Sequence, residues 1–143
     1  MNKRFVISWI GLTLASFVLG FVVHGLLLAN YYSALVPNMF RSQEDSQKVF
    51  HFMILADILI GFGLTWIYRK GAEPGKPAIG QGVRFGLAIA VFSVIPRYLI
   101  YYAVQPTPGI LVVKQIVFDT IAMVILGILA AVLNPAQDSI RTR

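Results

Sequence analysis

Four ionisable side chains stand inside long apolar stretches of this 143-residue sequence. They are His24, Asp57, Arg97 and Asp119, one in each of four stretches. An Asp, Lys or Arg at the centre of a membrane-spanning helix costs about 2.5–3.5 kcal/mol even on a lenient insertion scale. Charges kept at that cost pair with one another or form a binding site, so these residues are the first candidates for chemistry.

The residue types favour an arginine between two carboxylates. A planar guanidinium can donate two parallel hydrogen bonds to a carboxylate, so we expect Arg97 to point toward Asp57 and Asp119. His24 or Lys114 would offset the remaining negative charge, and Tyr101 follows Arg97 on the same helical face. Two interpretations stay open. One is a buried salt-bridge network that fixes the register of the helices; the other is a polar pocket, open outward, for a small molecule, lipid headgroup or ion.

A third hypothesis uses His24 and His51 as haem or metal ligands. The chain has no third histidine and no cysteine, and the spacing of the two histidines matches no metal motif. We therefore expect no metal and no cofactor. No histidine lies near Ser8, Ser16 or Ser93 on its own helix, so no hydroxyl nucleophile is predicted and the chain is not expected to be an enzyme.

The elements that must position these residues are the four apolar stretches. They cover residues 5–29, 50–68, 83–104 and 110–133. Each has about 20 residues, the length that crosses a hydrocarbon core of about 30 Å. The chain is 57% apolar and only 13% charged, whereas soluble domains are about 25% charged. The sequence predicts an all-α membrane protein, a bundle of four transmembrane helices that forms a single domain over residues 1–143.

Basic residues outside the stretches set the expected orientation. One side carries eight of them: Lys3, Arg4, Arg69, Lys70, Lys76, Arg84, Arg141 and Arg143. The other side carries Arg41 and Lys48, with Lys114 just inside the last stretch. Because cytoplasmic segments carry the excess of Lys and Arg, we expect both termini in the cytoplasm. The net charge of +6 then reflects topology, and no nucleic-acid binding is expected.

In this orientation all four ionisable groups fall in the outer half of the membrane. At about 1.5 Å of rise per residue, they lie roughly 8–14 Å below the outer surface. Small residues recur at helical spacing on the same faces: Ser16 and Gly20, Gly61 and Thr65, Gly86 and Ala90, Gly127 and Ala131. Small residues let helices approach closely in lipid, so these faces are expected to meet inside the bundle.

Two further features concern the shape of the bundle. Pro96 removes a backbone donor beside Arg97, which predicts a kink in the third helix. Residues 30–49 form a longer outer segment with Tyr31, Tyr32, Val36 and Phe40 among its apolar and aromatic residues. The segment is either a re-entrant or surface-lying piece, or an ordinary loop that carries part of an aromatic interface belt.

Several short segments are distinctive. They are Gly20-x-x-x-His24-Gly25, Trp66-Ile67-Tyr68-Arg69-Lys70-Gly71, Gly82-x-Arg84-Phe85-Gly86, Pro96-x-Tyr98-Leu99-Ile100-Tyr101-Tyr102 and Lys114-Gln115-Ile116-Val117-Phe118-Asp119. In these segments, which span most of its length, the chain resembles a family of small uncharacterised bacterial inner-membrane proteins with four helices. The resemblance implies a bacterial inner membrane, and it implies no activity, substrate or cofactor.

Taken together, the sequence favours a non-enzymatic membrane protein that serves as an accessory or structural subunit, or that forms a homo-oligomer. Its expected partners are the lipid bilayer and other membrane subunits or copies of itself. The alternative is binding or transport of a small molecule, lipid or ion through the polar pocket around Asp57, Arg97 and Asp119.

Overall fold

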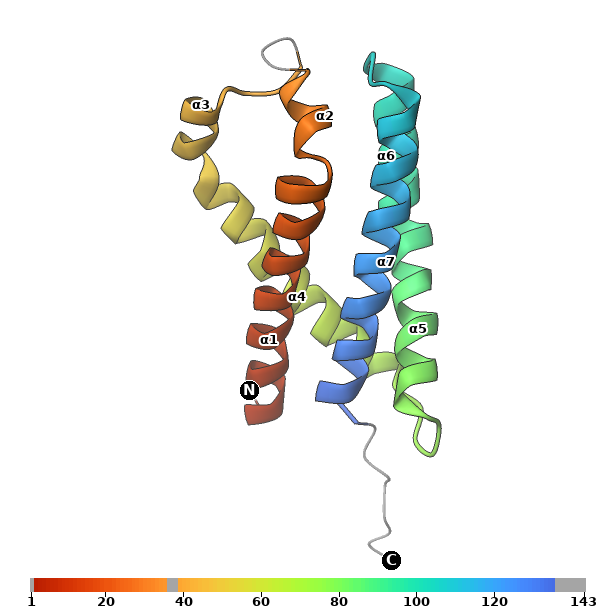
Figure 1. The fold of residues 1–143 in the computed structure, drawn as a ribbon. Helices are drawn as coiled ribbons and strands as arrows, with labels where there is room; N and C mark the ends of the chain where they lie inside the picture. Colours follow the sequence, from red (N-terminus) through yellow and green to blue (C-terminus); the bar gives the residue numbers. More distant parts are fainter. Residues whose placement is uncertain (1, 36–38, 136–143) are drawn as a thin grey trace, which may run out of the picture.

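The computed structural model of the protein describes residues 2–35 and 39–135. This part of the chain contains four helices that are long and apolar enough to cross a membrane (Figure 1). They cover Lys3–Leu27, Phe50–Gly71, Ala78–Val104 and Gly109–Leu133. The prediction of an all-α protein with four candidate membrane spans is confirmed, and the boundaries lie within a few residues of those expected.

Two of the spans change helix type along their length. The first consists of α1 (Lys3–Gly20) and a π-helical segment, η1 (Phe21–Leu27). The third consists of α5 (Ala78–Ile89), a second π-helical segment, η2 (Ala90–Val94), and α6 (Ile95–Val104). π-Helical turns are rare and often mark functional sites. The second of them ends immediately before α6, whose second residue is Pro96.

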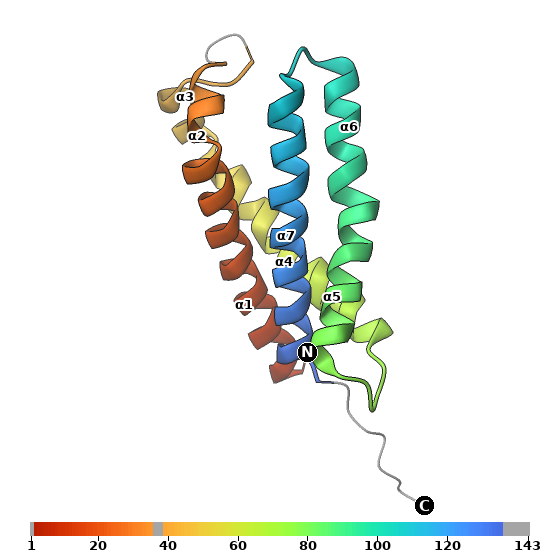
Figure 2. The same ribbon diagram turned by 45° about the vertical axis from the view of Figure 1, so that its right-hand side comes forward.

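The helix pair α5 and α7 (Gly109–Leu133) is packed backbone to backbone (Figure 2). A Cβ atom placed on Gly86 would lie 2.6 Å from the Met123 carbonyl oxygen of α7. Gly82 and Gly127 are equally close to the opposite helix, and Gly61 of α4 (Phe50–Gly71) is close to Thr13 of α1. The expectation that small residues mark the faces where helices meet is confirmed at Gly61, Gly86 and Gly127, whereas nothing lies within 4 Å of a Cβ atom placed on Gly20.

The helix α4 runs obliquely across the bundle and packs on α1 (Figures 1 and 2). In the last turn of α4, the ring of Tyr68 lies 5.3 Å from the ring of Phe85 of α5. Leu64 and Tyr68 join α1 and α7 residues in the largest buried cluster. The first half of α4 diverges from α6 and α7 (Figure 1). We call one end of the bundle the terminal end: α1 begins there, and α4 and α7 finish there. We call the opposite end the hairpin end.

The segment between the first two spans contains two short helices, α2 (Ala29–Ser33) and α3 (Gln43–Lys48). α2 continues beyond η1 at the hairpin end (Figure 1), where Tyr31 and Tyr32 pack against a buried cluster that includes Leu111 of α7. Both tyrosines are therefore packed into the hairpin end and do not only form an aromatic belt around it. Val36 lies outside the described residues, as do Arg141 and Arg143 of the orientation count.

Candidate ligand-binding site

An open cavity of about 790 Å³ lies among the spans, toward the hairpin end. Every span contributes to its wall: α1 and η1, the first half of α4, η2 with α6, and the middle of α7. Its polar lining residues are Ser16, His24, Asp57, Ser93, Arg97, Tyr98, Tyr101 and Asp119. The structure thus brings all four ionisable groups, and Tyr101, to one cavity.

Asp119 is the most highly connected group of the cavity. One of its carboxylate oxygens lies 3.1 Å from His24 Nε2. The other accepts a short hydrogen bond from the Tyr98 hydroxyl and lies 3.9 Å from a guanidinium nitrogen of Arg97. Its side chain is only 13% exposed. Three donors from two other spans therefore hold this carboxylate, which ties η1 and α6 to α7.

A hydrogen-bonded chain extends from Asp119 through His24 to the hairpin end. The second ring nitrogen of His24, Nδ1, lies 2.7 Å from the Tyr32 hydroxyl. The side-chain amide of Gln115 donates to that hydroxyl oxygen at 3.0 Å, which leaves the Tyr32 proton free to point at Nδ1. Both ring nitrogens of His24 therefore have a polar partner, Asp119 at Nε2 and Tyr32 at Nδ1. His24 is thereby fixed in both position and orientation.

Asp57 stands apart from this chain. One of its oxygens accepts a hydrogen bond of 2.5 Å from Ser16 of α1. Within the described part of the chain, Arg97 forms an ion pair with Asp119 and none with Asp57. The expectation that Arg97 lies between the two carboxylates is therefore wrong. Because α4 diverges from α6 at this level, Asp57 and Arg97 line the cavity separately.

The same divergence leaves Arg97 accessible. Its side chain is 50% exposed, and its guanidinium carbon lies 5.1 Å from the centre of the Tyr98 ring. A fully buried salt-bridge network was one of the two interpretations of the sequence, and the Arg97 side chain does not fit it. Most of the guanidinium donors remain available to a molecule in the cavity.

The other candidate residues lie outside the cavity. Lys114 donates to the Tyr31 hydroxyl at 2.6 Å and so anchors α2 to α7. His51 stacks beside Phe52 at the start of α4 and does not line the cavity with His24. Among residues 2–35 and 39–135, no three His, Asp or Glu side chains converge as a metal site would require.

Three contributors to the site were missed from the sequence: Tyr32, Tyr98 and Gln115. The depth of Tyr32 and Tyr98 in the sequence predicts either an aromatic interface belt or a hydroxyl-lined vestibule above Arg97, and it names no partner for either hydroxyl. Tyr98 follows Arg97 directly, and a helix places consecutive residues about 100° apart, so the sequence did not put both on one side. The π-helical segment η2 changes the register of both residues relative to α5, and the sequence carries no recognisable signal for it.

Comparison with known proteins gives one match. A family model described as "Protein of unknown function (DUF1761)" matches residues 7–131. No curated protein and no solved structure matches the chain. The matched range includes every residue that lines the cavity.

Proposed function

We propose that this chain, which belongs to the DUF1761 family of proteins of unknown function, binds an amphipathic small molecule of the membrane. The binding site is the cavity around Arg97, Asp57 and Asp119. One observation carries this proposal. A single cavity, open on one side, combines an apolar wall with the ionisable group of each of the four spans.

The size and lining of the cavity suit a small molecule. Small-molecule sites typically measure about 300–1,000 Å³ and are mostly apolar, with few polar groups that orient the ligand. The cavity measures about 790 Å³. Its apolar wall includes Phe17, Phe21, Phe50, Met53, Ile60, Val94, Met123 and Leu126. An acyl or isoprenoid body would find this wall more favourable than a polar channel.

The polar groups define the kind of headgroup. Asp119 is engaged by His24 and Tyr98 at contact distance and by the charge of Arg97 at 3.9 Å. Among the described residues, Arg97 makes no side-chain hydrogen bond, and Asp57 accepts one, from Ser16. A matching headgroup presents an acceptor to Arg97 and a donor to Asp57. Because these two groups carry opposite charges, we expect a zwitterionic or polyhydroxylated headgroup rather than a strongly anionic one.

The contacts within the cavity favour binding over catalysis. Both ring nitrogens of His24 are engaged, by Asp119 and Tyr32. Ser16 donates to Asp57, and Ser93 donates to the Ile89 carbonyl at 2.8 Å. In the described residues, therefore, no cavity serine is paired with a histidine as an activated nucleophile would be.

The setting that we propose is the bacterial inner membrane, with both termini in the cytoplasm and the cavity in the outer half. The excess of Lys and Arg on one side supports this orientation. We further propose that η2 and Pro96 together bend the third span, because both interrupt the regular backbone hydrogen bonds beside the cavity. A bend there would help to keep α6 away from the first half of α4.

A second candidate function is that of an accessory subunit or homo-oligomer. The divergence of α4 from α6 and α7 supports it, because a helix of a partner could lie along the open side of the cavity. Exposed apolar residues on the first half of α4, such as Phe52 and Leu55, would contact either lipid or that partner.

Native mass spectrometry after mild detergent extraction tests the proposal. We expect a bound amphipathic molecule in the wild type. Ala122→Phe should abolish its retention by filling the cavity, and Arg97→Gln should reduce it roughly tenfold or more, as loss of a charge-assisted hydrogen bond would. Ile121→Phe is the matched control, since Ile121 is exposed on the same helix and does not line the cavity.

The outcomes separate the two functions. Equal retention by Ala122→Phe and Ile121→Phe would contradict binding in the cavity. A stoichiometric second subunit or a second copy, present in both variants and without any small molecule, would instead support the accessory or oligomeric role.

A further inference from the structure

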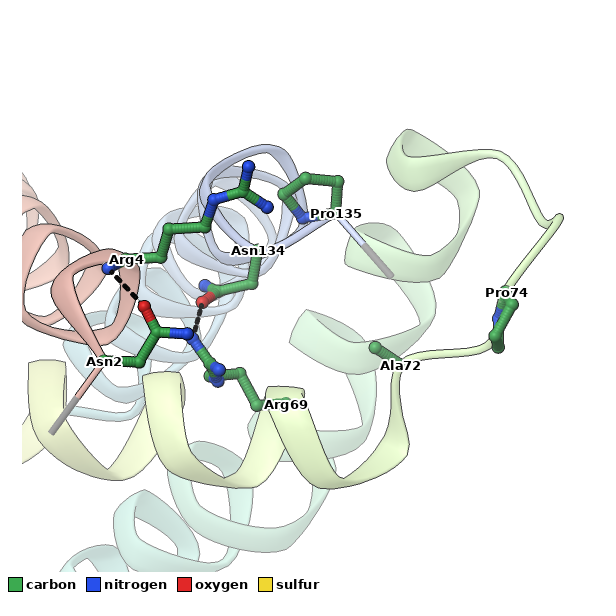
Figure 3. Close-up of a pocket in the computed structure, with 7 residues that line it drawn as sticks. All are labelled: Asn2, Arg4, Arg69, Ala72, Pro74, Asn134 and Pro135. Carbon is green, nitrogen blue, oxygen red and sulfur yellow. Dashed lines mark hydrogen bonds between the residues drawn. The ribbon is translucent and has the colours of Figure 1, made fainter. Parts of the chain in front are cut away.

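The terminal end of the bundle holds a second, smaller cavity of about 260 Å³. Figure 3 shows its seven lining residues: Asn2, Arg4, Arg69, Ala72, Pro74, Asn134 and Pro135. They come from the start of α1, the last turn of α4 with the segment after it, and the end of α7. Two of the seven are arginines and none is acidic.

The guanidinium of Arg69 is held in place by a buried polar network. One of its nitrogens donates to the Asn134 side-chain oxygen at 3.4 Å, and its carbon lies 5.8 Å from the centre of the Phe5 ring. Asn134 is itself fixed, because its amide nitrogen donates to Ser8 Oγ at 2.6 Å and to the Ala130 carbonyl at 2.9 Å. Asn134 is 5% exposed, so its oxygen is aimed at Arg69 by the packing of the bundle.

Both arginines retain donors toward the cavity. Within residues 2–35 and 39–135, neither Arg4 nor Arg69 forms an ion pair with a carboxylate. The nearest acidic residue in sequence to Arg69, Glu73, is engaged by Lys76 and Arg84. Both arginines line one cavity whose lining includes no acidic residue, and planar guanidiniums match phosphate geometry well.

The position of this cavity indicates where such an anion would come from. It lies where the spans Lys3–Leu27 and Phe50–Gly71 reach one end, which is the depth of lipid headgroups if the spans cross a bilayer. Basic pockets between helix ends are a recurrent way of binding anionic phospholipids. Topology alone explains basic residues at helix ends, but it does not require two of them to converge on one hydrogen-bonded pocket.

We propose that Arg4 and Arg69 form a binding site for a phosphate group, either the phosphodiester of an anionic lipid headgroup or free phosphate. The site is separate from the cavity at the hairpin end and does not depend on what that cavity binds.

The test uses the full chain, delipidated in mild detergent and supplied with phosphatidylglycerol, phosphatidylcholine or inorganic phosphate. Binding of lipid is read by native mass spectrometry, and thermal stabilisation is read for all three probes. We expect the wild type to prefer phosphatidylglycerol, and Arg4→Gln to reduce that binding about tenfold. Arg4→Lys should recover only part of it because the fork geometry is lost.

Lys3→Gln and Lys70→Gln are the matched controls, because they remove one charge from the same helix ends without touching the cavity. Arg4 carries the test because Arg69→Gln would also disturb Asn134. Stabilisation by inorganic phosphate alone, lost in Arg4→Gln, would support the site with free phosphate as its ligand. Equal losses in Arg4→Gln and Lys3→Gln, or no response of the wild type to either anionic probe, would overturn the proposal.

Discussion

His24 Nε2 lies 3.1 Å from a carboxylate oxygen of Asp119, so the π-helical segment of the first span is tied to the middle of α7. Asp119 also accepts from Tyr98 of α6, which makes it the point where three spans meet through polar contacts. Each of these groups would carry an uncompensated polar atom in lipid if its partner were removed. The contact therefore holds the cavity walls together as well as lining them.

The first prediction concerns the relative importance of the cavity charges. We expect Asp119→Ala to lower the free energy of unfolding by about 3 kcal/mol, because it leaves His24 and Tyr98 without their acceptor. Arg97→Ala should cost much less, because its single ion pair, at 3.9 Å, is longer than a hydrogen bond. Thermal unfolding in detergent measures both. Equal losses would mean that Arg97 is buried by a partner or ligand under the conditions used.

The second prediction concerns the glycine contact between α5 and α7. Gly86→Ala places a Cβ atom 2.6 Å from the Val124 Cα, so the helices must separate, at a cost of about 1–3 kcal/mol. Gly63→Ala is the control, because nothing lies within 4 Å of its added Cβ. That change should leave the unfolding temperature unchanged or raise it slightly, since Ala is the better helix former. A similar fall for both variants would argue against the close packing.

The positions of the four spans could be predicted from the sequence, because the length of an apolar stretch is a local property of the chain. Gly86 and Gly127 were also informative, since small residues at helical spacing predict close approach and the structure has it. The pairing of the charges was a different problem. Arg97 was expected to reach Asp57, but the oblique course of α4 separates them, and a helix crossing angle depends on packing across the whole interface.

The contributions of Tyr32 and Tyr98 could not be predicted for a related reason. Tyr32 reaches His24 from α2, a separate short helix after η1, and no proline or glycine lies at Leu28, where the two helices meet. Tyr98 reaches Asp119 beyond η2, where π-helical turns shift the helical register. Both effects arise from tertiary packing, and the periodic spacing of apolar residues along the sequence does not predict it.

The third prediction concerns orientation. The chain has no cysteine, so single cysteines can report which side of the membrane a residue occupies. Ser46→Cys in α3 and Gly80→Cys in α5 are suitable, because both positions are exposed and lie on opposite ends of the bundle. A membrane-impermeant maleimide added to intact spheroplasts should label the first variant and reach the second only after lysis. The reverse pattern would place the large cavity in the inner half of the membrane.

The last prediction concerns pH and lies outside the spans, in the segment between α4 and α5. The hydrogen bond and the charge of Lys76, with a further contribution from Arg84 at 3.8 Å, lower the pKa of Glu73 from its ordinary value of 4.5. A carboxyl group with a lowered pKa in the folded state stabilises the fold above its unfolded pKa. That contribution is lost as pH falls through the folded value.

We therefore expect the wild type to unfold at a slightly higher temperature than Glu73→Gln at neutral pH. The gap should narrow as pH falls below the unfolded pKa of about 4.5 and close only below the lowered folded pKa, where the carboxyl group is protonated in both folded and unfolded chains. The effect is small because the group is exposed to water. Comparing the two chains at each pH cancels the titration of other groups. A gap that stays constant down to about pH 3 would show that Glu73 acts through packing and not through its charge.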